Sequence, residues 1–207
     1  MTWPAVHRRF AQWSRTRVWA RLHRIVLDEL GALGAPDRSR CAIDSVSIGD
    51  AKKRAAHRTE SERSRQARIE NPPDTNRNGP PLSLGISAAD LHDSQGLMPL
   101  VRGIPLTRFR RGPRRRRPGK LHGDKSYDHD HLRRWLRSHD MRHRIAREGV
   151  ESSQRLGRHR WVAEPTVSWP AGCRRLHRRY ERKPEHFLVF VGIAALLIGH
   201  RRLTRIR

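Results

Sequence analysis

The sequence predicts an α/β fold, a mixed β-sheet with helices on its faces. Short apolar stretches of strand length alternate along the chain with segments whose apolar residues recur every three or four positions. One longer apolar run, FLVFVGIAALLI (187–198), has the composition of a core helix. A chain of 207 residues can also bury a sizeable core. We therefore expect one α/β domain over 41–207, preceded by a helical segment over 1–40.

The helical prediction for 5–34 rests on apolar residues at helical spacing. These residues are Val18, Trp19, Leu22, Ile25, Val26, Leu30 and Leu33. Gly31, Gly34 and Pro36 are expected to end the helix. The next stretch, CAIDSVSI (41–48), predicts a short strand that contains Asp44.

Residues 50–80 differ abruptly in composition from their flanks. Ile69 is their only large aliphatic residue, and no period of two or 3.6 is visible. We predict a disordered insert over 50–80. Order is expected to resume with a strand at 81–87, followed by a helix that begins at Asp93 or Ser94.

The second half of the chain predicts the remaining elements. KLHGDKSYD (120–128) indicates a strand ending at Asp124, and the following DHDHLRRWLRSH indicates a helix. A further strand is expected at 142–147, and 158–183 has helical tendency despite Pro165 and Pro170. The apolar run at 187–198 is shorter than the roughly 20 residues of a membrane span. We therefore expect a buried helix there and no membrane segment.

The charge of the chain points to a polyanionic partner. Lys and Arg number 45 against 20 Asp and Glu, which gives a formal net charge of +25. Nucleic acid is the first candidate and an acidic membrane surface the second. The densest basic segment, RFRRGPRRRRPGK (108–120), is expected to contact phosphates, although a solvated turn is the alternative. Two cysteines provide no disulfide framework, which fits a reducing cytosol.

Three acids lie beside apolar stretches: Asp44, Asp124 and Glu164. Carboxylates are almost never fully buried unless a partner or a metal compensates them. Taken singly, Asp44 could be a turn or edge residue, Asp124 could begin a helix, and Glu164 could form a surface ion pair. Brought together, they would repel one another unless a divalent cation joined them, which is the arrangement of metal-assisted phosphoryl chemistry.

Several blocks closely resemble DDE transposases of the insertion-sequence-five group. The blocks are RRFAQWSRTRVWARLHRIVLDEL, CAIDSVS, GPPLSLGISAADLHDSQGLMPLVRGIP, RRGPRRRRPGKLHGDKSYD, RLGRHRWVAE and AGCRRLHRRYERKPEHFLVF. They span nearly all of the chain except 50–75. The resemblance implies a ribonuclease-H-like sheet, dependence on Mg²⁺ (or Mn²⁺), and cutting and joining of DNA at insertion-sequence ends.

The resemblance also implies roles for individual residues. Asp44, Asp124 and Glu164 match the three catalytic, metal-binding acids, and Arg160 matches the basic residue one helical turn before the glutamate. The DNA-contacting residues that we predict are Arg110, Arg111, Arg114, Arg115, Arg116, Arg117, Lys120 and Arg158. The expected partners are terminal inverted repeats, target DNA, a second copy of the chain on DNA and an N-terminal product of an upstream frame. The expected location is the bacterial cytoplasm, at the nucleoid.

Departures from the family pattern predict a degenerate copy. The text of 51–75 does not match the family, and our hypothesis is that it is the same DNA translated in a shifted frame, which would remove the second strand of the sheet. Gly123 and Ser126 replace an expected alanine and glycine, and Pro165 and Pro170 lie near Glu164. The chain also begins late relative to the family's DNA-binding region. The alternatives are a non-catalytic DNA-binding protein derived from a transposase and an unfolded basic protein.

Overall fold

The computed structural model describes residues 2–35, 38–50, 64–70, 80–88, 91–147 and 173–206. Its elements are, in chain order, α1 (Trp3–Arg15), α2 (Val18–Ala32), β1 (Cys41–Asp50), β2 (Ser64–Glu70), β3 (Pro81–Ala88), α3 (Ser94–Gly103), β4 (Lys120–Gly123), the 3₁₀ turn η2 (Lys125–Tyr127), α4 (Asp130–Ser138), β5 (Arg142–Ile145), the 3₁₀ turn η6 (Arg174–Leu176), β6 (Arg178–Arg179) and α6 (Pro184–Ile206).

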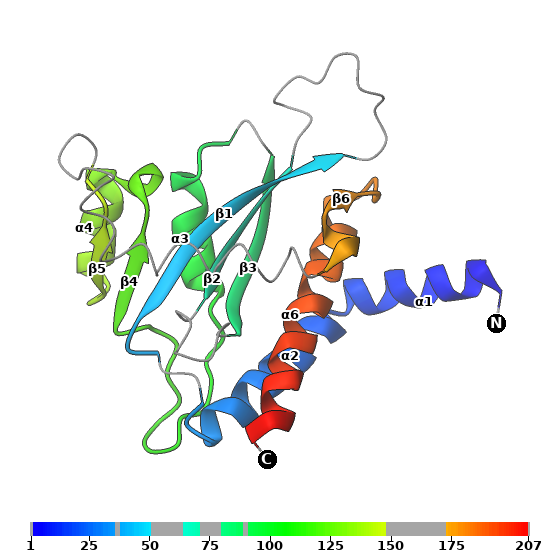
Figure 1. Cartoon of the computed structure of the whole chain (residues 1–207), viewed down its shortest axis with the longest axis horizontal. Helices are drawn as coiled ribbons and strands as arrows, with labels where there is room; N and C mark the ends of the chain where they lie inside the picture. Colours follow the sequence, from blue (N-terminus) through cyan, green and yellow to red (C-terminus); the bar gives the residue numbers. More distant parts are fainter. Residues whose placement is uncertain are drawn as a thin grey trace.

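The strands form one mixed sheet in the order β3-β2-β1-β4-β5, with β6 beside the end of β1 (Figure 1). The first three strands are antiparallel neighbours, whereas β1, β4 and β5 are parallel. The mixed α/β prediction is therefore confirmed. Because the parallel strands point the same way, their carboxyl ends meet at one edge of the sheet, where functional side chains can gather.

The prediction of a disordered insert over 50–80 is wrong for residues 64–70. These residues form β2, which pairs with β1 from Ala42↔Glu70 to Ile48↔Ser64 and with β3 on its other side. The hypothesis that the second strand is missing is wrong for the same reason. Backbone N–H and C=O groups make the ladder, so a segment with little apolar character can still fill a central place between two strands. The rest of 51–79 lies outside the described residues.

The N-terminal segment is two helices rather than the single helix predicted over 5–34. The chain turns at Arg17, whose φ of 54° lies in the left-handed region. No residue of α1 is buried, whereas α2 buries His23, Val26, Leu27 and Leu30. Leu22, Ile25 and Leu33, which we placed on the apolar face, are 39%, 55% and 42% exposed. The buried face of α2 is thus narrower than the sequence pattern suggests.

The main core lies between the sheet and the helices α2, α3 and α4. Its fully or nearly fully buried side chains include Leu27, Cys41, Ile43, Leu82, Leu97, Leu100, Ile104, Leu121, Tyr127, Leu132, Leu136 and Ile145. Leu132 and Leu136 are one turn apart on α4, as the predicted apolar stripe requires. This core fixes the strand ends from which the candidate site is built.

The predicted C-terminal core helix is present as α6. Phe187, Val191 and Ala194 are buried and pack with Leu84 and Ile86 of β3, and the C-terminal half packs on α2 through Val26 and Leu30. By length and composition alone, α6 could also cross a membrane, and 33% of its most apolar window is buried. The helix predicted over 158–183 is wrong for its described residues, because Arg174–Leu176 form η6 and Arg178–Arg179 form β6.

Candidate active site

The parallel register of β1 and β4 brings two of the predicted acids to the same level. Cys41 pairs with Leu121 and Ala42 with His122. Two residues further along, each strand reaches an acid, Asp44 on β1 and Asp124 directly after β4. Neighbouring strands lie about 4.8 Å apart, so the register continued by two residues places these two positions side by side. Of Asp44 the structure describes the backbone but not the side chain.

Asp124 is exposed and its carboxylate is held in one orientation. It is the N-cap of η2, and its Oδ1 accepts hydrogen bonds from the Ser126 backbone N–H at 3.1 Å and the Ser126 hydroxyl at 2.5 Å. The serine is one of the departures from the family pattern, and here it provides the second of these bonds. The predicted strand ends at Gly123, one residue before Asp124, and Asp124 begins the short 3₁₀ turn η2 and not the helix α4.

An internal ion pair fixes the turn that follows Asp124. Arg133 of α4 donates to Asp128 Oδ1 through Nε at 2.9 Å and through a terminal nitrogen at 2.6 Å, and also donates to the Ile145 carbonyl at 3.1 Å. The side chains of Arg133 and Asp128 are only 13% and 19% exposed. The Ala146 N–H donates to the Gly123 carbonyl at 3.2 Å. Asp128 therefore serves to join η2, α4 and β5, and it is not a free acid of the site.

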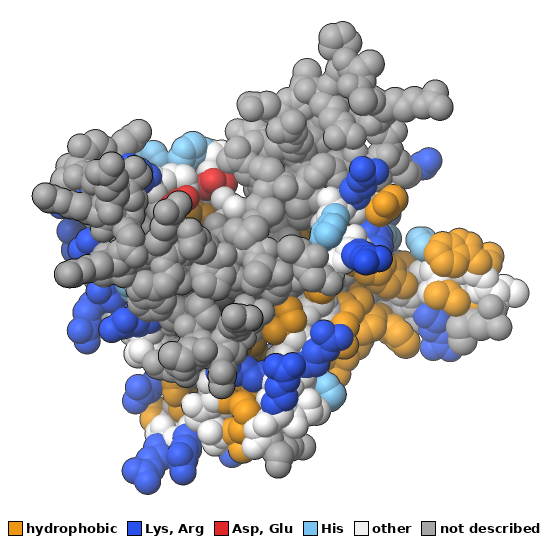
Figure 2. Space-filling model, in the orientation of Figure 1, with side chains coloured by type: hydrophobic (Ala, Val, Ile, Leu, Met, Phe, Trp, Pro, Cys, Tyr) orange, Lys and Arg blue, Asp and Glu red, His pale blue; other side chains and the backbone are white. Residues whose placement is uncertain are grey.

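Three histidines lie near this turn. The rings of His92 and His129 are 5.2 Å apart, and those of His129 and His131 are 5.5 Å apart. His92 Nδ1 is 2.8 Å from the Ser94 hydroxyl at the start of α3, where Asp93 occupies the N-cap position without making the cap hydrogen bond. In Figure 2 a few acidic atoms and histidines gather in the upper left of the visible face. Across the described residues, no three His, Cys, Asp or Glu side chains are placed to hold a metal.

The remaining predicted catalytic residues are not placed. Glu164, Arg160 and Arg158 lie outside the described residues, as do Pro165 and Pro170. Of the predicted site, the structure therefore brings together the positions of Asp44 and Asp124 only. Asp44 lies within β1 and Asp124 directly after β4, and carboxylates are the residue type that suits a hard cation such as Mg²⁺ or Mn²⁺.

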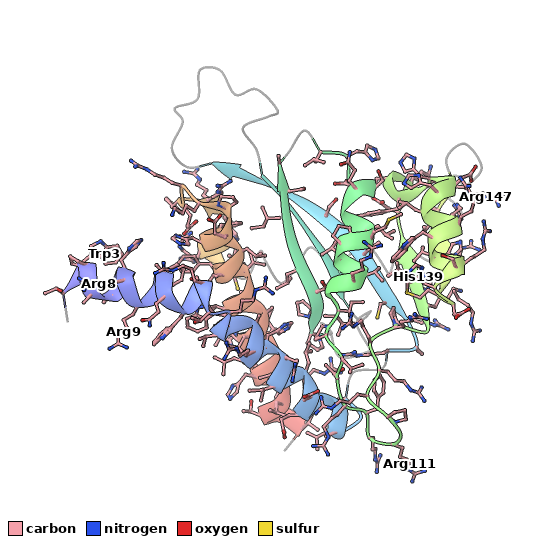
Figure 3. The ribbon with its side chains drawn as sticks, turned by 180° about the vertical axis from the view of Figure 1, so that it is seen from behind. Trp3, Arg8, Arg9, Arg111, His139 and Arg147 are labelled. Atoms are coloured by element: carbon pink, nitrogen blue, oxygen red, sulfur yellow. The ribbon has the colours of Figure 1, made fainter. Side chains whose placement is uncertain are left out.

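The predicted DNA-binding segment lies at the opposite end of the parallel strands from Asp124. Residues 107–115 form a hairpin closed by two hydrogen bonds between Thr107 and Arg115, and the chain then enters β4 at Lys120, its amino end. Figure 3 shows Arg111 at the lower right of the view and Arg147, which follows β5, at the upper right. The basic hairpin is thus separated from Asp124 by the full length of β4, about 13 Å.

Several of the hairpin arginines have contacts within the protein. Arg114 donates to both oxygens of Asp28 on α2, at 2.9 and 2.7 Å, and the Arg108 N–H donates to the same carboxylate. Hydrogen bonds from Arg114 and Arg108 hold the pKa of Asp28 below its ordinary value, although burial acts in the opposite direction and is the largest single influence. The hairpin backbone also lies against Gly31, where any Cβ would overlap the Arg108 carbonyl.

Arg115, Arg116 and Arg117 of the predicted DNA-binding segment, and Arg38 outside it, also have contacts within the protein. Arg115 and the buried Arg38 lie over the Phe109 ring, at 5.7 and 5.5 Å from its centre. Arg116 reaches the Arg102 carbonyl at 3.4 Å, and Arg117 donates to the His139 carbonyl at 2.9 Å. In contrast, Arg110 and Arg111 are exposed and form no hydrogen bond or ion pair with any described residue. They are the hairpin side chains best placed for phosphate.

The family model for the "Transposase DDE domain" matches residues 37–198, well over half of the chain. This chain belongs to the DDE transposase family. A protein from Burkholderia cepacia described as "Putative transposase for insertion sequence element IS402" is 35% identical over 131 residues, which cover 63% of this chain and 62% of that protein. The chain thus spans less than two thirds of the length of this relative. The DDE family generally uses divalent metal ions.

Sequence reasoning missed two basic residues at the acidic edge. Lys125 is exposed and follows Asp124 directly, and Arg147 is exposed just beyond β5. Because Gly123 pairs with Ile145, Arg147 lies within two residues of the level of Asp124. In the sequence Lys125 directly follows the strand predicted to end at Asp124, and Arg147 is the last residue of the strand predicted over 142–147, which is a weaker signal than the dense run at 108–120.

Proposed function

We propose that this DDE transposase is an enzyme of insertion-sequence transposition that cleaves DNA and transfers strands at the element's ends, with Asp44, Asp124 and Glu164 as its catalytic acids. The observation that carries the proposal is the parallel register that aligns Asp44 with Asp124. A ribonuclease-H-like fold belongs to the same proposal. It is supported by a mixed sheet in which one strand, β1, contains an acid and its parallel neighbour, β4, is directly followed by another.

The residues of this chain would act by positioning. Asp44, Asp124 and Glu164 would hold a divalent cation, Mg²⁺ or Mn²⁺, which when bound supplies stabilisation of the negative charge on the phosphate under attack. Water, or a 3′-hydroxyl, forms the new bond to phosphorus while the bond to the leaving 3′-oxygen breaks. The Ser126 hydrogen bonds keep the Asp124 carboxylate in place, and the Arg133–Asp128 pair keeps the turn that carries it.

Basic side chains would position the DNA. Lys125 and Arg147 are near enough to the acidic edge to contact the phosphates that flank the cleaved bond, a role that we also assign to Arg160 and Arg158. Phosphate contacts of this kind fix register without selecting a base sequence. Terminal inverted repeats, target DNA and a second copy of the chain are the partners that the transposition reaction requires, in the cytoplasm at the nucleoid.

A cleavage assay tests this proposal. The full chain is incubated with Mg²⁺ and a duplex that carries the terminal inverted repeats, and nicked products are resolved on a denaturing gel. Asp124→Asn is expected to lose cleavage while it retains DNA binding. Asp130→Asn is the matched control, because Asp130 is an exposed acid six residues away on α4. Cleavage that persists in Asp124→Asn would contradict the assignment.

One observation favours a second candidate, a DNA-binding protein without catalysis. The exposed hairpin arginines Arg110 and Arg111 lie at the edge opposite Asp124 and could bind phosphates even if the acids never meet. The two candidates differ in the same assay. DNA binding without cleavage by the unmodified chain, in Mg²⁺ and in Mn²⁺, would select the second.

A further inference from the structure

A large groove follows the outer edge of the sheet, away from the acids. Its volume is about 1200 Å³, and residues of β3 and of the four helices α1, α2, α3 and α6 line it. From β3 every residue between Leu82 and Ser87 contributes. Side chains of a strand alternate between its two faces, so a groove that touches six consecutive residues is reached from the edge of the strand.

The packing of β3 explains why its edge is open. Leu84 and Ile86 face α6, whereas Ser83 faces α3, where a Cβ at Gly103 would be 2.7 Å from the Ser83 hydroxyl. The helices α6 and α3 therefore lie on opposite faces of the strand, and neither covers its edge. In the described part of the sheet β3 pairs with β2 on one side only, and Figure 1 shows it as the last strand before α6 and α2. An edge strand with free backbone groups is a template for another strand.

The dimensions of the groove suit one extended chain. The six residues of β3 that line the groove extend for about 20 Å, so the groove is long enough to hold an extended segment of similar length beside the strand.

The groove is lined by a buried histidine, His23, and by a glycine, Gly192, that faces open space. His23 on α2 is 9% exposed, lines the groove and is hydrogen bonded to the Pro81 backbone, and its Nε2 has no hydrogen-bond partner among the described residues. Burial lowers the pKa of His23 to about 4, so at neutral pH the imidazole is uncharged and Nε2 is an acceptor. Gly192 on α6 also lines the groove, and a Cβ there would meet nothing within 4 Å.

The rim of the groove is basic. Arg15, Arg17, Arg21 and Arg24 of the α1–α2 elbow line it, against the two carboxylates Asp93 and Glu185. The remaining lining is largely apolar and includes Leu84, Ile86, Leu91, Leu188 and Val189. An apolar floor, an open strand edge and a positive rim are complementary to an extended peptide with alternating apolar and acidic residues.

We propose that this groove binds an extended acidic segment of a partner protein, which pairs with the edge of β3 as an additional strand of the sheet. The backbone of the segment would hydrogen bond to β3, and a donor of the segment would satisfy His23 Nε2. The site is independent of Asp44 and Asp124, so it stands whether or not the chain cleaves DNA. Nucleic acid could contact the arginine rim, but it has no peptide backbone to pair with the edge of β3 and no aliphatic side chains to pack on the apolar floor.

The test uses the full chain and a fluorescein-labelled peptide of about eight residues that alternates glutamate and valine. Fluorescence anisotropy measures its affinity, and hydrogen exchange follows the amides of 84–87. We expect binding that slows exchange in β3 but not in β5. Replacing glutamate by lysine in the peptide should weaken binding about ten-fold or more, and N-methylation of alternate peptide bonds should abolish it.

Two variants locate the binding. Gly192→Phe fills the groove and is expected to weaken peptide binding about ten-fold or more without unfolding the helix, because the position is open. Leu197→Phe is the control, since Leu197 is 52% exposed on the same helix and does not line the groove. The double variant Arg15→Glu, Arg24→Glu should remove the preference for the acidic peptide over the lysine peptide.

Three results would overturn the proposal. The first is the absence of measurable binding to the unmodified chain, and the second is binding that Gly192→Phe leaves unchanged while circular dichroism shows both variants folded. The third is competition by an oligothymidylate of eight nucleotides whose own binding Gly192→Phe weakens equally, which would assign the groove to nucleic acid.

Discussion

The two ends of β4 carry opposite chemistry. At its amino end the basic hairpin presents Arg110 and Arg111 to solvent, and at its carboxyl end Asp124 lies beside the position of Asp44. The hairpin is held by cation contacts within the protein, most clearly Arg114 on Asp28, whereas the acidic edge is held by Arg133 on Asp128. In both regions one arginine fixes the backbone, so that other charged side chains remain available to solvent. Charge density along the sequence therefore overstates how many residues can contact DNA.

The two ends of β4 are also expected to contribute different things to the reaction, DNA affinity at the amino end and catalysis at the carboxyl end. Phosphate contacts supply most of the binding free energy for DNA and depend on salt, whereas carboxylates at strand ends contribute repulsion to DNA unless a cation is bound. If the proposed function is correct, changes at the acidic edge should abolish the reaction, and changes at the hairpin should weaken binding.

Asp44→Asn should produce the largest change. The substitution removes one negative charge of the proposed cation site, and we expect DNA cleavage to fall about 10³-fold, because such a site supplies several kcal/mol of charge stabilisation. Binding to the same duplex should be unchanged or slightly tighter. Single-turnover cleavage and a gel-shift titration measure the two quantities. Equal loss of both would show that Asp44 is needed for the fold and not for the chemistry.

Arg133→Met should strongly destabilise the protein. It removes the Arg133 cation from the largely buried Asp128 carboxylate and also removes the bond to the Ile145 carbonyl, so we expect the free energy of unfolding to fall by about 3 kcal/mol. Urea denaturation measures this difference. The double variant Arg133→Met, Asp128→Leu should recover most of it, since no uncompensated charge remains. A single variant as stable as the parent would remove the proposed anchor of the acidic edge.

Arg110→Ala combined with Arg111→Ala should weaken DNA binding uniformly across sequences. Two lost phosphate contacts should reduce the slope of log K against log salt by about 2. Cleavage at saturating DNA should be unaffected, because the hairpin is at the opposite edge from Asp124. Arg114→Ala is the informative comparison, since that side chain is bound to Asp28 and its loss should act through stability. An unchanged salt slope in the double variant would place the phosphate contacts elsewhere.

Asp28→Asn should make the stability of the hairpin region less dependent on acid. The folded-state pKa of Asp28 lies below its ordinary value of 3.8, so its contribution to stability is present above pH 3.8 and is lost as the pH falls through the lower folded-state pKa. The difference in melting temperature between the parent and Asp28→Asn should be constant near neutral pH and should shrink below about pH 3.8. A difference that grows on acidification would have the wrong sign for a lowered pKa.

Ser126→Gly should have the smallest effect. It removes the hydroxyl that donates to Asp124 Oδ1 at 2.5 Å and leaves that oxygen with the backbone bond. We expect the Mg²⁺ concentration for half-maximal cleavage to rise by a factor of about two to five, because one bond that orients the carboxylate is lost while the backbone bond remains, a difference of about 0.5–1 kcal/mol. Ser138→Gly, on an exposed serine of α4, is the control. A decrease in the Mg²⁺ requirement would show instead that the hydroxyl competes with the cation for the carboxylate.

Most strands and helices followed from the sequence because their apolar residues sit at the right spacing. Strand β1, strand β3 and helix α4 lie where their patterns predicted them. Strand β2 could not be predicted, since a strand in the middle of a sheet is stabilised by backbone bonds to two neighbours that a local window does not contain. The break at Arg17 could not be predicted either, because no glycine or proline marks it.

The sequence alone determined the family, the identity of the three candidate acids and the excess of positive charge, since each depends only on which residues are present and in what order. The tertiary structure decided which of them are neighbours. Parallel pairing of β1 with β4 aligned Asp44 with Asp124, although 80 positions separate them. The direction of β4 sent the basic hairpin, which ends close to Asp124 in sequence, to the opposite edge of the sheet. The direction of a strand and the identity of its neighbours depend on the whole sheet, so the local sequence does not determine which residues lie beside each of its ends.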